Sequence, residues 1–186
     1  MSSEPSTDAS SSSPDLDAIY QELQRFRAGF STLSMATCGP DGEPDASYAP
    51  FVELDGNLYV FVSALSTHTA NLIERGRVSV LFIEEETTAA HPFVRRRLTF
   101  QCRVEEIARD RDGYAAVLDL FETRFGGLVA TLRGLADFHL LRLHPERGRY
   151  VKGFGKAFAI DDVGLARIRH LRESGRRNVP GDDSAV

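Results

Sequence analysis

Two Asp-Gly pairs, Asp41-Gly42 and Asp55-Gly56, restrict the fold of this chain more than any other feature of its sequence. Asp-Gly is a strong signal for a two-residue β-hairpin, because both central residues of the favoured turn need a positive φ. Apolar or alternating segments flank the two pairs, at residues 30–37, 46–54 and 58–62. Tight hairpins cannot join parallel neighbours, so a doubly wound parallel sheet is excluded.

The rest of the sequence predicts a mainly β fold with added helices. Alternation or short apolar runs predict further strands at residues 78–83, 97–107, 138–143, 150–152 and 157–160. We expect Pro50 to place its strand at a sheet edge or beside a bulge, and HPERG to turn the chain after 143. Helical spacing predicts helices that start at Asp15 or Asp17, at Thr67, near Arg111, near Leu128 and at Asp161. Six or seven strands interrupted in this way indicate an antiparallel barrel.

Length and composition indicate one domain and exclude several classes of site. The chain has 186 residues, and we expect a disordered Ser-rich leader (1–14), a barrel domain (15–173) and a flexible tail (174–186). A net charge of -5 argues against a nucleic-acid groove. Cys38 and Cys102 lie far apart, which indicates neither a disulfide framework nor a zinc site. No apolar run approaches membrane-spanning length, so we expect a cytoplasmic protein without a membrane or nucleic-acid partner.

The clearest candidate site follows the strand 58–62. An apolar strand gives way there to a polar loop and a helix start, and free N–H groups at a helix start bind anions. Polar side chains that could add to such an anion site are Ser63, Ser66, Thr67, His68, Thr69 and Asn71. The alternative is an ordinary helix cap, made by Ser66 or Thr67.

Two further features indicate ligand contacts. Gly153-Phe154-Gly155 interrupts the last strand pair, and glycines in such a position indicate either backbone laid against a flat ligand or a plain bulge. Of the neighbouring arginines Arg96 and Arg97, Arg97 adjoins a strand and is the better candidate for pairing with a phosphate or carboxylate.

Several long segments resemble a known superfamily. SYAPFVELDGNLYVFVSALSTHTANL, RRRLTF and RFGGLVATLRGLADFHLLRLHPERGRYVKGFGKAFAI are similar to the FMN-binding split barrels, the pyridoxamine 5′-phosphate oxidase-like fold. LADF and VKGFGKA resemble its haem-utilisation branch, of the HugZ/HutZ type, and the resemblance covers roughly residues 17 to 172. It implies a Greek-key split barrel that forms a homodimer, with a site for haem or FMN at each interface.

The resemblance also implies roles for individual residues. In flavin-binding relatives the segment matching Ser63 to Asn71 holds the FMN phosphate, with a lysine or arginine commonly where His68 stands here. In the haem-binding branch, a histidine of the C-terminal tail binds the iron and the aspartate of LADF, here Asp137, supports it. His170 is the histidine of this tail, and the alternative is that it is an exposed residue of a terminal helix.

The leading hypothesis is a dimeric haem-binding protein that opens the haem ring with O2 and an external electron donor, releasing iron. Arg97 and His68 would anchor the ligand. One alternative is an FMN-dependent oxidoreductase with its phosphate on Ser63, Thr69 and Arg97. Another is a haem carrier or storage protein without catalytic activity.

Overall fold

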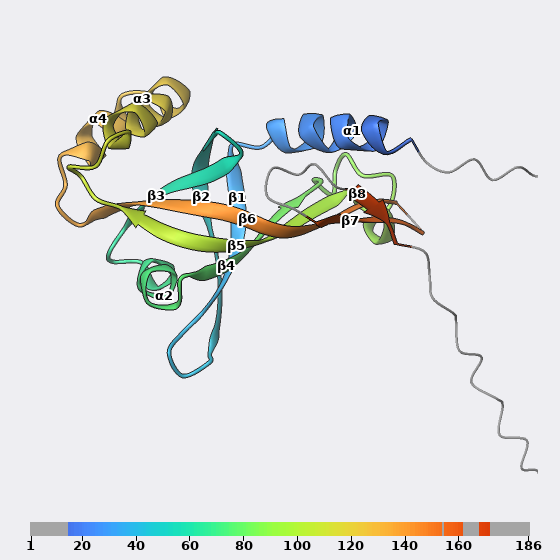
Figure 1. The fold of residues 1–186 in the computed structure, drawn as a ribbon, viewed down its shortest axis with the longest axis horizontal. Helices are drawn as coiled ribbons and strands as arrows, with labels where there is room; N and C mark the ends of the chain where they lie inside the picture. Colours follow the sequence, from blue (N-terminus) through green and yellow to red (C-terminus); the bar gives the residue numbers. More distant parts are fainter. Residues whose placement is uncertain (1–14, 154, 162–167, 172–186) are drawn as a thin grey trace, which may run out of the picture.

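The computed structural model describes residues 15–153, 155–161 and 168–171 (Figure 1). Within these residues the strands are β1 (Thr32–Cys38), β2 (Pro44–Leu54), β3 (Asn57–Ser63), β4 (Arg77–Ile83), β5 (Arg97–Ile107), β6 (Phe138–Gly153), β7 (Lys156–Asp161) and β8 (Ile168–His170). The α-helices are α1 (Leu16–Ala28), α2 (Thr67–Arg75), α3 (Tyr114–Phe125) and α4 (Leu128–Arg133), and Pro92–Val94 forms a 3-10 turn. The predicted leader 1–14, tail 174–186 and Phe154 lie outside the described residues.

Six strands close into an antiparallel barrel. The sheet order is β3-β2-β1-β4-β5-β6-β7-β8, and an additional pairing of β3 with β6 closes the ring. β3 pairs with the first part of β6, residues 138–143, whereas β7 pairs with its later part, residues 147–153. The predicted mainly β split-barrel fold is confirmed, with β7 and β8 extending the sheet beyond the closed ring.

Both predicted hairpins are present, but only the second has the predicted two-residue turn. Asp55 and Gly56 join β2 to β3 with φ values of 51° and 74°, the left-handed conformation that a tight hairpin requires. Asp41 and Gly42 lie in a longer loop between β1 and β2, residues 39–43, in which Gly42 has a positive φ and Asp41 does not. Pro50 lies at a local edge of the sheet, as predicted, because residues 44–50 of β2 pair with β1 on one side and with no described strand on the other. It lies where β2 changes partner, from β1 up to Pro50 to β3 from Phe51.

Two apolar clusters explain why β3 is an unbroken apolar run. Alternate residues of β3, such as Val60, point into the barrel with Phe100 and with Leu23 of α1. The intervening residues, such as Phe61, pack against residues of α3 and α4. Both faces of β3 are therefore covered, which removes the polar alternation expected of a half-exposed strand.

The structure corrects two predictions near the C-terminus. HPERG is not a turn, since β6 continues through it. The pairing with β5 shifts between Gln101 and Cys102, so Glu146 is the extra residue of a bulge, a position that tolerates the neighbouring Pro145. The helix predicted from Asp161 is wrong for Ile168–His170, which pair with β7 as β8, while residues 162–167 lie outside the described part.

None of the helices described is long and apolar enough to cross a membrane.

Candidate ligand-binding site

The structure brings Ser63 and Asp137 together although they lie 74 residues apart in the sequence. Ser63 ends β3 and Asp137 directly precedes β6, so closure of the barrel makes them neighbours. The Ser63 hydroxyl donates to Oδ2 of Asp137 at 2.8 Å, and the amide of Ala64 donates to the Asp137 carbonyl at 2.7 Å. The amide of Leu65 in turn donates to the Ser63 Oγ at 3.1 Å. Asp137 therefore fixes the loop between β3 and α2.

Two other predicted site residues are enclosed by the chain itself. Thr69 is 1% exposed and Asn71 is 4% exposed. The Thr69 hydroxyl donates to the Ser63 carbonyl at 2.7 Å, and Nδ2 of Asn71 donates to Thr37 Oγ1 at 3.0 Å. Within one chain these groups hold α2 against the barrel. The alternative reading of Ser66 as an ordinary side-chain cap is wrong, because its side chain makes no capping hydrogen bond to α2.

His68 lies in the first turn of α2 and is half-buried. Burial lowers the pKa of its imidazole, and the carboxylate of Asp45 opposes this shift without cancelling it. His68 is therefore neutral at pH 7. A neutral imidazole can accept a hydrogen bond or bind a metal, but it cannot replace the fixed cation that a phosphate favours.

The other predicted residues lie around the start of β7. Arg97 begins β5, opposite Val151 of β6, and its Nη1 donates to the Arg95 carbonyl at 3.3 Å. Gly153 and Gly155 form the hairpin between β6 and β7, where Gly155 has a φ of 67°. The backbone of His170 pairs with Phe158 of β7.

Charge pairing distinguishes Arg97 from the two arginines before it. Arg95 pairs with Glu86 at 2.9 Å, and Arg96 pairs with Glu84 at 2.6 Å. The hydrogen bonds from Arg96 lower the pKa of Glu84, as expected for a paired carboxylate. Among the ion pairs of the described residues, none involves Arg97, so its charge remains available to a ligand.

The predicted site residues therefore form two groups at opposite ends of the barrel. We call them the α2 end (Ser63, His68, Asp137) and the β7 end (Arg97, Gly153, Gly155, His170). β6 spans the distance, because Phe138 pairs with Ser63 and Tyr150 pairs with Phe158, the partner of His170. At about 3.3 Å per residue this is roughly 40 Å of strand, and Figure 1 shows α2 and β8 well apart along β6. Asp137 and His170 of one chain do not meet.

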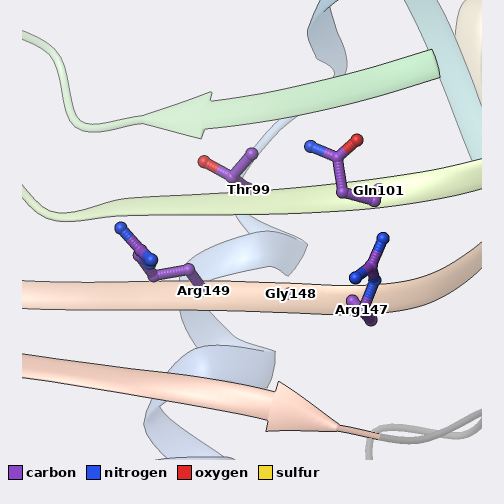
Figure 2. A pocket seen from close by; sticks show the side chains of 5 residues that line it. All are labelled: Thr99, Gln101, Arg147, Gly148 and Arg149. Atoms are coloured by element: carbon purple, nitrogen blue, oxygen red, sulfur yellow. The ribbon is translucent and has the colours of Figure 1, made fainter. Parts of the chain in front are cut away.

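The sequence interpretation missed two basic residues of β6. Arg147 and Arg149 line a hollow on the outer face of the sheet with Thr99, Gln101 and Gly148 (Figure 2). Their alternation is the signal of a strand. The sequence analysis did not recognise this alternation, because it assigned residues 144–148, which include Arg147, to a turn.

Asp137→Ala is expected to loosen the loop after β3. The Ser63 hydroxyl loses its acceptor, and a lost hydrogen bond to a charged group in a half-buried position costs about 1–2 kcal/mol of unfolding free energy. The measurement is chemical denaturation together with hydrogen exchange at the amides of Ala64 and Leu65. Asp137→Asn, which keeps an acceptor oxygen, is the control and should stay close to the original protein. Unchanged exchange at Leu65 in Asp137→Ala would contradict the role of Asp137 in this loop.

Comparisons with known proteins agree with this fold. The family model described as pyridoxamine 5′-phosphate oxidase matches residues 19–152. The chain is 38% identical over 159 residues to a protein named heme oxygenase HutZ from Vibrio cholerae, covering 86% of this chain and 90% of that protein.

Two solved structures are similar over most of the chain. Campylobacter jejuni ChuZ has a TM-score of 0.79 at 31% identity, covering 90% of this chain and 68% of that one. The structure of Vibrio cholerae HutZ, described as a heme storage protein, has a TM-score of 0.68 at 40% identity, covering 73% of this chain and 95% of that one. The chain therefore belongs to the pyridoxamine 5′-phosphate oxidase family of split barrels and, within it, to the haem-utilisation branch of HutZ and ChuZ.

Proposed function

We propose that this chain binds haem in a site that a second copy of the chain completes, and that the bound haem is opened oxidatively there. The similarity to HutZ over most of both chains carries the proposal. HutZ is described both as a heme oxygenase and as a heme storage protein, so haem binding is common to its descriptions. Degradation is the further step that experiment must separate from storage.

The separation of the two groups of residues supports the need for a second copy. A two-fold axis places the same surface of both chains in contact. If that axis runs across the length of β6, a residue at one end of the first chain meets the other end of the second. An antiparallel pair of barrels would join the α2 end of each chain to the β7 end of its neighbour. Two equivalent sites would form, each with residues from both chains.

The residues at each such site fit haem. His170 would bind the iron, and Asp137 of the second copy would orient and support its imidazole. The available charge of Arg97 suits a propionate, and the neutral His68 suits a hydrogen bond to one. Among the described residues no cluster of three or more His, Cys, Asp or Glu forms a metal site, and haem needs only an axial ligand from the protein. Bound haem would supply the iron that activates O2 and the ring that is oxidised, with electrons from an external donor.

The first experiment separates haem from flavin and monomer from dimer. Purified protein is titrated with hemin and, separately, with FMN, and each titration is followed by absorption; light scattering gives the mass of the particle. We expect a shifted Soret band at one hemin per chain and the mass of two chains. A flavin spectrum without a hemin response would assign the site to FMN, and a monomer that binds hemin would remove the second copy from the proposal.

The second experiment separates degradation from storage. The hemin complex receives ascorbate, which supplies the electrons, in the presence of O2. Loss of the Soret band with a verdohaem or biliverdin spectrum supports ring opening and release of iron. An unchanged Soret band would make the protein a haem store or carrier.

His170→Ala is expected to alter the Soret band and to weaken hemin binding by at least tenfold. Loss of groups that only support a metal ligand typically costs 10- to 100-fold in affinity, and loss of the ligand itself should cost at least as much. The measurement is the hemin titration of the variant. His91→Gln is the control, since His91 is an exposed residue that stacks on Phe93 beside the 3-10 turn. A hemin spectrum identical to that of the original protein would remove His170 from the iron.

A further inference from the structure

A hollow on the outer face of the sheet carries two arginines with no assigned role. Its volume is about 420 Å³, and it is lined by Thr99, Gln101, Arg147, Gly148 and Arg149. Arg147 and Arg149 are exposed and alternate along β6, so both lie on the outer face. Figure 2 shows their guanidinium groups on the side of β6 that faces β5, with Thr99 and Gln101 across from them.

The neighbouring strands leave positive charge in this hollow. On β5 the partner of Arg149 is Thr99, and on β7 its partner is Ala159, neither of which is acidic. Arg147 lies between Gln101 of β5 and Asp161 of β7. Of the four positions that pair with Arg147 and Arg149 on the neighbouring strands, one carries a carboxylate, so the two guanidinium groups leave a net positive charge.

Other arginines of the same face are already paired. Glu146 lies 3.2 Å from Arg77 and 3.8 Å from Arg103, which lie on β4 and β5. Arg97, by contrast, precedes Thr99 by two residues on the same face of β5, which makes it a diagonal neighbour of Arg149. The unpaired guanidinium of Arg97 therefore adds positive charge next to the hollow.

The spacing suits a ligand with more than one negative charge. Arg147 and Arg149 are two residues apart on one strand, or about 7 Å. Each guanidinium can donate two parallel hydrogen bonds to a carboxylate or phosphate. The Thr99 hydroxyl adds a further donor, while Gln101 uses its Nε2 to donate to Ser79 Oγ at 3.0 Å.

We propose that Arg147 and Arg149 join Arg97 in binding the anionic groups of the ligand, carboxylate or phosphate, so that the three arginines form a row of cations along the outer face. This inference rests on the proposed function, because it takes the ligand to be a ring compound with acidic side groups. The inference adds that the chain prefers a ligand with free acidic groups. A ligand whose acidic groups are masked should bind more weakly, because it cannot pair with these two arginines.

The test compares hemin with hemin dimethyl ester, in which both carboxylates are masked. In Arg147→Gln/Arg149→Gln we expect hemin affinity to fall by about tenfold or more, because two charge-assisted contacts are lost. Affinity for the ester should stay the same, so the preference for hemin shrinks. Arg103→Gln removes an equal charge from the same face, one whose guanidinium is paired with Glu146, and it is expected to keep the preference within about twofold.

Other outcomes decide against the proposal or locate its failure elsewhere. A double variant with an unchanged preference for hemin over the ester overturns it. A double variant that is monomeric but keeps its preference for hemin also overturns the proposal, since the arginines would then hold the two copies together.

Pyrophosphate, titrated by calorimetry without haem, tests the hollow separately. If the original protein binds neither porphyrin, the haem proposal fails; binding of pyrophosphate that the double variant lacks then supports an anion site for phosphate, and no binding overturns that too.

Discussion

Phe100→Ala is expected to lower the free energy of unfolding by about 4 kcal/mol, the usual cost of removing a fully buried aromatic ring. Phe100 is 0% exposed, lies at the centre of the barrel and has its ring 6.5 Å from that of Phe82. Directly across on β6 is Gly148. The ring of Phe100 occupies the space that a side chain at Gly148 would take, so the cavity left by its removal would be large. Chemical denaturation measures the loss.

Gly148→Ala supplies the control for this interpretation. In the original protein the new Cβ would lie 2.7 Å from Cδ1 of Phe100, and overpacking of this kind costs about 1–3 kcal/mol. In the Phe100→Ala background the same methyl group should cost far less, because it enters the cavity. The two changes should therefore be non-additive. Strict additivity would show that the two residues do not share this space.

Glu53→Ala is expected to cost about 3 kcal/mol, because it leaves a buried charge without its partner. Arg27, at the end of α1, is 4% exposed, and its Nη2 donates to Gln24 at 2.7 Å and to Glu53. Its Nη1 has no partner within the described residues. Glu53 is the less buried member of the pair, with a side chain that is 33% exposed. Most of the loss in unfolding free energy therefore comes from the buried guanidinium of Arg27, which is left without its partner.

Arg27→Met separates the charge from the packing. Methionine fills much of the same volume without a charge, and replacement of buried ion pairs by apolar residues is often close to neutral. We therefore expect Arg27→Met/Glu53→Ala to be more stable than Glu53→Ala alone, as measured by denaturation in the same buffer. If Glu53→Ala unfolds like the original protein, the pair makes no net contribution to holding α1 on the barrel.

Local sequence signals predicted most of the strands and turns. The alternation of residues 97–107 gave β5 with its observed bounds, and the Asp-Gly pair at 55–56 gave the turn between β2 and β3, because each depends on contacts between near neighbours. Asp15 also caps α1 as expected, with its carboxylate accepting from the amides of Asp17 and Ala18.

The errors arose where distant residues decide the local structure. Pro145 and Gly148 look like turn residues, yet Pro145 is tolerated by a bulge against β5 and Gly148 makes room for Phe100. Similarly, Ser63 and Asp137 meet only because β3 closes on β6, and the pairing of β5 with β6 places Arg97 at the opposite end. Such pairings are set by the whole sheet, which no short window of sequence contains.

The unbroken course of β6 limits how this protein can change in length. A single strand joins the barrel at its start to β7 at its end, so an insertion or deletion of one residue that no bulge absorbs would turn every side chain beyond it to the opposite face. Outward arginines would then enter the barrel and core residues would face water. Without a bulge such as the one at Glu146, only changes of two residues preserve the pattern, and each would move the two ends apart or together by about 7 Å.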